Sequence, residues 1–268
     1  MKMHHFWRIV DRVIFESDIL LEVVDARMPN LTRNKKVENM IRRKRKSLIL
    51  VINKSDLITR GMRISFSRQL DSKEAVFVSC KERTGLFALK EIILELAKKG
   101  RHSNFIKVGV IGYPNTGKSS VINVLSGFKE VAKTSPIAGF TTGVQWIKGK
   151  GGLMFTDTPG VIPPDEKDEA EQALMSIIDP NKLKNPDFAA MKIIQLFLDN
   201  NRSGLEKYYG VSAKAGNASE ILLEIGRKKN FLLKGDQVDE GRTALAIIRD
   251  WQKGKLLLNS ADIKTNSR

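Results

Sequence analysis

Apolar runs of strand length alternate with amphipathic segments of helix length over the first 160 residues. A helical pattern covers 5–16. The apolar runs lie at 19–24, 47–52, 75–78, 106–111 and 153–156. The amphipathic segments between them lie at 34–45, 61–71, 84–99 and 117–126. The apolar runs are rich in β-branched residues and almost uninterrupted, as in parallel strands covered on both faces. The pattern predicts a doubly wound, mostly parallel α/β sheet, with one more strand at 143–147.

The pattern changes after Pro163-Pro164. Residues 168–258 contain no strand-like run, and the helix-length segments that replace it lie at 168–178, 187–199, 217–228 and 240–253, punctuated by Pro180, Pro186, Gly204 and Gly235. The last ten residues are polar and predict a frayed end. We therefore expect an α/β domain at 1–164, a smaller all-helical domain at 165–258 and a flexible tail at 259–268.

A phosphate-loop pattern stands between one apolar run and the next amphipathic segment. Residues 112–119 read Gly-Tyr-Pro-Asn-Thr-Gly-Lys-Ser, in the strand–loop–helix context that gives Gly-x4-Gly-Lys-Ser its meaning. The glycines let backbone N–H groups turn toward phosphates at the positive end of a helix. Lys118 is expected to reach the outer phosphates and act in catalysis, and the Ser119 hydroxyl to ligate Mg²⁺. The predicted loop contacts are Pro114, Asn115, Thr116, Gly117, Lys118, Ser119 and Ser120.

Two further segments complete the predicted phosphate site. Asp157 and Gly160, in Asp-Thr-Pro-Gly, follow the apolar run 153–156, which predicts that Asp157 holds Mg²⁺ and that the Gly160 N–H contacts the terminal phosphate. The segment from residue 158 to 166 would then sense the nucleotide. Between the two motifs, Thr141 is expected to complete the magnesium shell, with Thr142 as the alternative.

A base-recognition pattern follows the apolar run 47–52. Asn53-Lys54-Ser55-Asp56 places a carboxylate where it can accept hydrogen bonds from N1–H and the N2 amino group of guanine. Adenine offers neither donor, and an unpaired buried acceptor costs about 1–3 kcal/mol, which favours GTP over ATP. Asn53 would position the loop and the Lys54 stem would cover the base. A second loop, Ser79-Cys80-Lys81, follows the run 75–78 and is expected to complete the guanine site.

Charge points to a polyanionic partner. The net charge is +16, and residues 1–160 hold 29 Lys and Arg against 14 Asp and Glu. Such a field favours nucleic acid, with a solvated basic surface or acidic lipid as alternatives. The densest cluster, 42–46, also suits a helix C-terminus. The sequence has no apolar run of membrane-spanning length and no signal peptide, and Cys80 is its single cysteine, which together predict a cytoplasmic protein.

The order of the motifs is circularly permuted, because the base-recognition motif precedes the phosphate loop. Together with Val24-Asp-Ala-Arg-Met-Pro29, Gly139-Phe-Thr-Thr-Gly-Val-Gln-Trp146 and the segment 239–255, this order resembles the circularly permuted ribosome-assembly GTPases of the YlqF/RbgA type. The resemblance implies a GTPase that binds rRNA in a maturing large ribosomal subunit and leaves after hydrolysis. We expect the helical domain at 165–258 to be an RNA-binding or effector domain, and the protein to be monomeric in isolation. The chain departs from the bacterial pattern at its start, where His4-His5 lacks the preceding Pro-Gly.

Val161 occupies the position at which many GTPases carry the glutamine that orients the attacking water. Slow intrinsic hydrolysis is therefore expected, and the candidates for the missing function are a ribosomal surface, His4 or His5, or K⁺. Asn115 matches the residue that holds K⁺ in potassium-stimulated relatives. A membrane-surface or signalling switch is the main alternative, against which the absence of a terminal lipidation cysteine argues. A non-hydrolysing RNA-binding protein is a third possibility, disfavoured by the intact Lys118, Ser119 and Asp157.

Overall fold

The computed structural model describes residues 3–70, 75–98, 105–127, 145–157, 168–213 and 216–258, without the side chains of 3–6, 145 and 157. The chain forms two compact units. One comprises Met1–Asp56 and Arg60–Glu166, and the other comprises Leu57–Thr59 and Lys167–Arg268. The boundary predicted at 164/165 lies outside the described residues.

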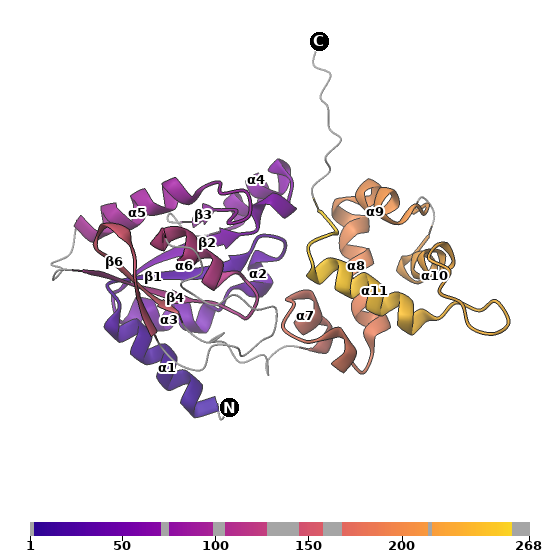
Figure 1. The fold of residues 1–268 in the computed structure, drawn as a ribbon, viewed down its shortest axis with the longest axis horizontal. Helices are drawn as coiled ribbons and strands as arrows, with labels where there is room; N and C mark the ends of the chain where they lie inside the picture. The colour runs from indigo at the N-terminus through magenta and orange to yellow at the C-terminus, as the bar shows by residue number, and fades with distance from the viewer. Residues whose placement is uncertain are drawn as a thin grey trace, which may run out of the picture. The chain divides into compact units, whose positions relative to one another are not determined.

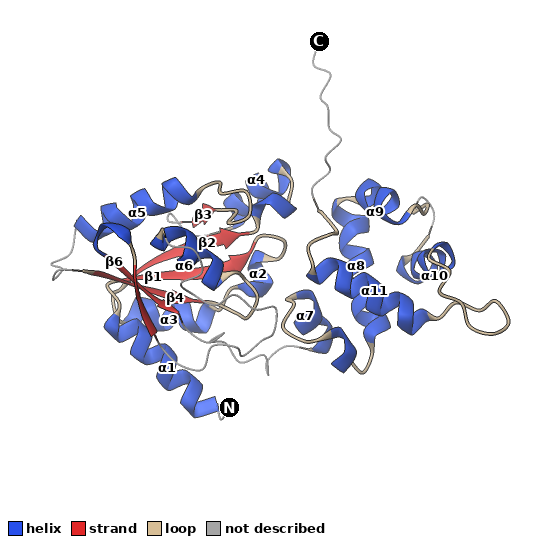
Figure 2. Cartoon of the chain, in the orientation of Figure 1, coloured by secondary structure: helices blue, strands red, loops and turns tan. Residues whose placement is uncertain are grey.

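The first unit is built on a six-stranded sheet in the order β3-β2-β1-β4-β6-β5 (Figure 2). The strands are β1 (Ile19–Asp25), β2 (Ser47–Asn53), β3 (Ala75–Phe77), β4 (Ile106–Ile111), β5 (Gln145–Lys148) and β6 (Leu153–Asp157). Among the strand pairs that the described residues form, the edge pair β5–β6 is antiparallel and the others are parallel. The strand expected at 143–147 corresponds to β5, which covers Gln145–Lys148, while positions 143 and 144 lie outside the described residues. The predicted doubly wound, mostly parallel sheet is confirmed.

Helices cover both faces of this sheet (Figure 1). The odd-numbered apolar residues of β1 pack in the core with α5 (Leu86–Lys98) and α6 (Lys118–Ser126). Leu20, whose side chain points to the other face, packs with α1 (Met3–Glu16) and α3 (Lys35–Arg43). The other α-helices among the described residues of this unit are α2 (Pro29–Thr32) and α4 (Arg60–Gln69), and α4 buries none of its residues.

The second unit is helical. The α-helices among its described residues are α7 (Glu169–Leu174), α8 (Pro186–Asn200), α9 (Arg202–Tyr209), α10 (Ala218–Lys228) and α11 (Glu240–Gln252). Trp251 is fully buried, meets the Phe197 ring edge-on at 6.1 Å, and donates its indole N–H to the Leu174 carbonyl at 2.8 Å. This aromatic pair anchors α11 against α8 and α7.

Two details of the second unit differ from the sequence-based expectation. Gly204, expected to separate helices, lies in the first turn of α9, where an added Cβ would meet the Asn201 amide at 2.3 Å. Leu57–Thr59, which directly follow Asp56, belong to the second unit, where Ile58 forms a parallel bridge with Leu258. The chain therefore joins the two units at the base-recognition motif as well as after residue 166.

Candidate functional site

The predicted nucleotide motifs meet because the strands that carry them are parallel. Asp25 and Asn53 are register partners at the carboxyl ends of β1 and β2, and the phosphate loop follows β4, the other neighbour of β1. Ligands of doubly wound sheets bind at this edge. The sheet thus brings the base-recognition loop and the phosphate loop to one place despite their permuted order in the chain.

The phosphate loop depends on two glycines. Gly112 has φ +146°, and an added Cβ would lie 2.4 Å from the Val23 carbonyl oxygen. Gly117 has φ +96°, and its Cβ would lie 2.2 Å from the Asn53 Nδ2 atom. Side chains are excluded at both positions by conformation and by space. The loop can therefore approach β1 and the base-recognition loop closely.

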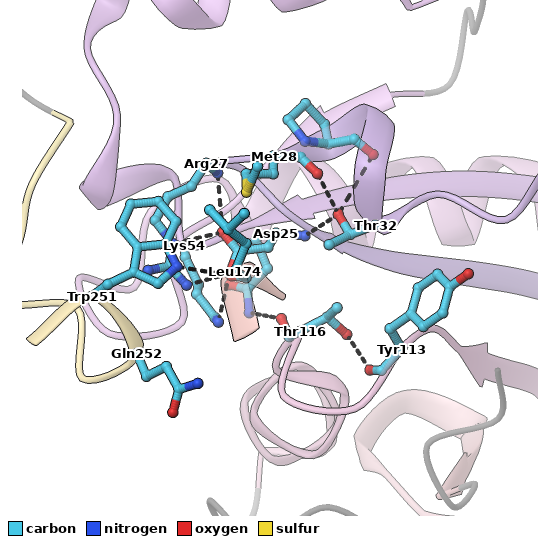
Figure 3. Close-up of polar contacts among 12 residues, drawn as sticks. Asp25, Arg27, Met28, Thr32, Lys54, Tyr113, Thr116, Leu174, Trp251 and Gln252 are labelled. Atoms are coloured by element: carbon cyan, nitrogen blue, oxygen red, sulfur yellow. Dashed lines mark hydrogen bonds and ion pairs between the residues drawn. The ribbon is translucent and has the colours of Figure 1, made fainter. Parts of the chain in front are cut away.

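Lys118 begins α6 and folds back over the loop. It is 7% exposed, and its Nζ donates to the Tyr113 carbonyl oxygen at 2.8 Å. The Thr116 hydroxyl donates to the same oxygen at 3.0 Å (Figure 3). The ammonium group is thus held within the loop, beside the N-terminus of a helix whose dipole favours anions.

Asn53 ties three loops together. Its Nδ2 donates to the Thr116 carbonyl at 3.0 Å, and its Oδ1 accepts from the Cys80 N–H at 3.4 Å. The side chain is almost fully buried. The position of the base-recognition loop is therefore coupled directly to the phosphate loop and to the loop after β3.

Asp56 is half-buried and held by the loop after β3. The Ser79 hydroxyl donates to Asp56 Oδ1 at 2.6 Å and accepts from the Glu82 N–H at 3.0 Å. Burial, with a smaller contribution from Asp56, raises the pKa of the Cys80 thiol to about 12, so this cysteine is neutral at physiological pH. Lys81 is exposed, with its Nζ 3.8 Å from Glu82. The loop thus orients the carboxylate expected to read guanine.

A buried ionic network supports Lys54 from β1. Lys54 has φ +63°, and its Nζ lies 2.7 Å from Asp25 Oδ2. Arg27 donates to the same carboxylate from Nε at 3.0 Å and from Nη2 at 2.8 Å (Figure 3). The backbone N–H of Asp25 donates to the Thr32 hydroxyl. Burial alone would raise the pKa of Asp25, but Arg27 and then Lys54 outweigh it and hold the pKa well below its ordinary value.

Sequence reasoning assigned no site role to Asp25 or Arg27. The sequence contained one indication of such a role, which is where these two residues stand. They follow an apolar run that forms a strand, and the carboxyl end of this strand lies beside the end of the strand that finishes at Asn53.

Several predicted residues have no described side-chain geometry. Thr141, Thr142, Gly160 and Val161 lie outside the described residues, and Asp157 ends β6 with its side chain undescribed. His4 and His5 lie in the first turn of α1, also without described side chains.

Four of the predicted phosphate-loop contacts are half-buried around the start of α6. They are Pro114, Asn115, Ser119 and Ser120.

Comparison with known proteins bears on this arrangement. Residues 107–220 match the family model described as "50S ribosome-binding GTPase". The chain is 38% identical over 258 residues to the uncharacterized GTP-binding protein MJ1464 of Methanocaldococcus jannaschii, covering 96% of this chain and 67% of that protein. The solved GNP-bound YlqF from T. maritima is similar over 94% of this chain and 95% of its own, with a TM-score of 0.60 and 21% identity.

The chain belongs to the family of GTP-binding proteins that includes MJ1464, and it has the fold of the GTPase YlqF.

Other relatives of this GTPase are longer. It is 34% identical to nucleolar GTP-binding protein 2 of Pneumocystis carinii and 31% identical to that of Saccharomyces cerevisiae, covering 93% of this chain each time. The chain spans about half the length of these relatives, 52% in both cases. The shared region therefore corresponds to the two units described above.

The contact between Gly117 and Asn53 yields a direct prediction. Gly117→Ala should lower GTP affinity about tenfold, because the Asn53 amide must leave the Thr116 carbonyl and the loop must adopt a strained conformation. Gly151→Ala is the matched control, since Gly151 has φ +73° with nothing within 4 Å of an added Cβ. It should cost about 1 kcal/mol of stability without changing GTP affinity. Equal GTP affinities of the two variants in a titration would contradict the assigned packing.

Proposed function

We propose that this GTPase hydrolyses GTP as a ribosome biogenesis factor that binds rRNA in a maturing large subunit and leaves after hydrolysis. The observation that carries the proposal is similarity over 93% of the chain to nucleolar GTP-binding proteins, together with the match to a 50S ribosome-binding GTPase model. Both point to the ribosome rather than to a signalling switch. No helix in the described part of the chain has the length and apolar character to cross a bilayer.

The residues at the carboxyl edge fit the parts that GTP binding needs. Asp56, oriented by Ser79, would accept the hydrogen bonds of guanine, and the Lys54 stem, fixed by Asp25, would cover the base. Lys118 would exchange its bond to the Tyr113 carbonyl for a phosphate oxygen. The Gly160 N–H would contact the terminal phosphate.

The donor set also fits Mg²⁺, which prefers hydroxyl and carboxylate oxygens. Ser119 in the first turn of α6, Asp157 at the end of β6 and Thr141 would hold the ion. When bound, it neutralises charge on the phosphates. The chain's own contribution is to position the phosphates at the start of α6 and to place Lys118 beside them.

The basic surface supplies the contact to RNA in this proposal. The excess of Lys and Arg lies in residues 1–160, whereas residues 161–268 are nearly balanced, with 17 basic against 16 acidic residues. Binding through phosphates releases counterions and weakens steeply as salt increases. We assign the electrostatic contact with RNA to the first unit and an effector role to the helical unit. We place the protein in the cytoplasm.

Asn115 provides a prediction about K⁺. Hydrolysis should be several-fold faster in K⁺ than in Na⁺ at matched ionic strength, because Asn115 would offer an oxygen ligand beside the phosphates. Asn115 has φ +61°, so Asn115→Gly removes the amide while keeping a backbone conformation that glycine readily adopts. That variant should hydrolyse GTP equally in both salts. Equal rates for the wild type would remove Asn115 from the mechanism.

A single-turnover hydrolysis assay tests the proposed function. Because Val161 cannot orient water, the isolated GTPase should be slow, and immature large subunits should accelerate it. Mature small subunits provide a control of similar charge. Acceleration by both kinds of particle to the same extent would argue against a large-subunit role.

A further inference from the structure

Three aromatic side chains of the first unit each have a lysine ammonium group near the ring. The pairs, with the distance from the lysine Nζ to the ring centre, are Phe15 with Lys44 (5.9 Å), Trp146 with Lys107 (5.4 Å) and Phe105 with Lys148 (5.7 Å). We call these six residues the aromatic–lysine strip. None of them belongs to the phosphate loop or to the base-recognition loop.

Two of the pairs project from the β5 edge of the sheet, on the face that carries α1. Ile147 of β5 packs in the core with α5 and α6, so its neighbours Trp146 and Lys148 point to the opposite face. An added Cβ at Gly109 of β4 would lie 3.1 Å from a side chain of α1. Lys107, two residues earlier in the same strand, therefore also points to the α1 face.

The last turn of α1 joins the third pair to these two. The Trp146 indole N–H donates to Glu16 Oε2 at 3.2 Å, so the ring lies against this turn. Phe15 is the residue next to Glu16, and Lys44, which approaches its ring, caps the C-terminus of α3. The strip thus extends from the end of α3 across α1 to the edge of the sheet.

The rings of the strip are accessible to a ligand. Phe15 is 72% exposed, Phe105 is 38% exposed and Trp146 is half-buried. A flat ligand that covered these rings would remove apolar area from water, which is favourable. Nucleobases are ligands of this kind, because each has a π-face that stacks on an aromatic side chain whatever the sequence.

The setting of the strip is positively charged. Arg43 and Arg45, on either side of Lys44 in the sequence, are exposed. Two acids beside the strip, Asp11 and Glu16, each lie 2.7 Å from a cation. A polyanion that approached this face would therefore meet an excess of positive charge.

We propose that the aromatic–lysine strip binds unpaired RNA, with bases stacked on its rings and phosphates at its lysines. A cation–π contact at an exposed site is weak, so a lysine can leave the ring for a phosphate when a base arrives. The bases of a duplex are already stacked on one another, so a duplex would engage the cations alone. The inference rests on the rRNA partner of the proposed function, and it names the form of RNA and the surface that receives it.

Fluorescence anisotropy of a labelled, single-stranded RNA of mixed sequence tests the stacking. The protein, saturated with GDP and Mg²⁺ so that the GTP site is filled, should bind this RNA more tightly than a duplex of the same sequence. Phe15→Ala should weaken binding of the single strand about tenfold without changing duplex binding, whereas Phe15→Tyr, which keeps a ring, should bind like the wild type. Phe87→Ala is the matched control, because Phe87 is 78% exposed on α5, on the opposite face of the sheet. It should change affinity less than about twofold.

Salt dependence tests the lysines. Lys148→Ala should reduce the slope of log Kd against log salt concentration by about 0.7, the value for one phosphate contact with a single strand. Lys98→Ala, at the end of α5, should leave the slope unchanged.

Three results would overturn the proposal. They are a loss in Phe15→Ala no larger than in Phe87→Ala, an equal loss with the duplex, and binding to phosphatidylserine vesicles that depends on Phe15 when RNA binding does not. Nucleotide-dependent pelleting with large subunits tests the proposed function separately. Pelleting that survives Phe15→Ala together with unchanged RNA affinity removes only the strip, and strip-dependent RNA binding without pelleting removes only the ribosomal role.

Discussion

Asp56→Asn should lower GTP affinity by about 100-fold or more and create a preference for xanthosine triphosphate. Two hydrogen bonds to a charged acceptor are lost, each worth about 1.5–3 kcal/mol, and the new amide suits the oxygen that xanthine carries at C2. The Ser79 hydroxyl, 2.6 Å from Asp56, holds the side chain in place for this recognition. Equilibrium titrations with GTP, xanthosine triphosphate and ATP measure the effect.

Ser79→Ala is the control for this change. It removes the orienting hydroxyl but keeps the carboxylate, so GTP affinity should fall by only about tenfold and the preference for guanine should remain. If the wild-type protein binds ATP as tightly as GTP, Asp56 does not read the base.

Asp25→Ala should reduce the free energy of unfolding by about 3–5 kcal/mol. The substitution leaves the buried Arg27, which is 2% exposed, and the partly buried Lys54 without their shared counter-charge. GTP affinity should fall as well, because the Lys54 side chain loses its anchor. Arg12→Ala breaks an exposed helical pair with Glu16 and should cost less than about 0.5 kcal/mol in the same denaturation assay.

The pH dependence of this stabilisation follows from the direction of the pKa shift. The pKa of Asp25 is lowered in the folded protein, so its contribution is fully present above the ordinary aspartate pKa, about 3.9. It is lost only as the pH falls below that value toward the folded pKa. The stabilities of wild type and variant should therefore stay parallel from neutral pH to about pH 5 and converge in stronger acid. A constant difference at all pH values would show that packing, not charge, causes the loss.

Local sequence was sufficient for the framework of the site. The strand before residue 112, the helix after it and the Asn53–Asp56 motif each follow from patterns within about ten residues, and a parallel sheet then places their loops at one edge. The permuted order did not obscure this, because the sheet order decides which loops meet.

Features that depend on distant partners were not predictable in this way. The second unit's α9 was missed because Asn201 ends α8 with its N–H and caps α9 with its side chain, so one residue separates two helices. The role of Asp25 needed Arg27, Lys54 and the register of β1 with β2. The burial of Glu22 is equally non-local, because a carboxyl group within an apolar run of the sequence does not reveal that the fold leaves it 0% exposed.

Pelleting of the GTPase with immature large ribosomal subunits tests whether GTP controls its association with the ribosome. The protein is incubated with subunits in the presence of GDP or of a non-hydrolysable GTP analogue, and the bound fraction is measured after sedimentation. We expect firm association with the analogue and release with GDP, because the proposed contact between the Gly160 N–H and the terminal phosphate exists only in the GTP-bound state. Equal binding in both nucleotide states, or no binding in either, would contradict a GTP-controlled cycle on the large subunit.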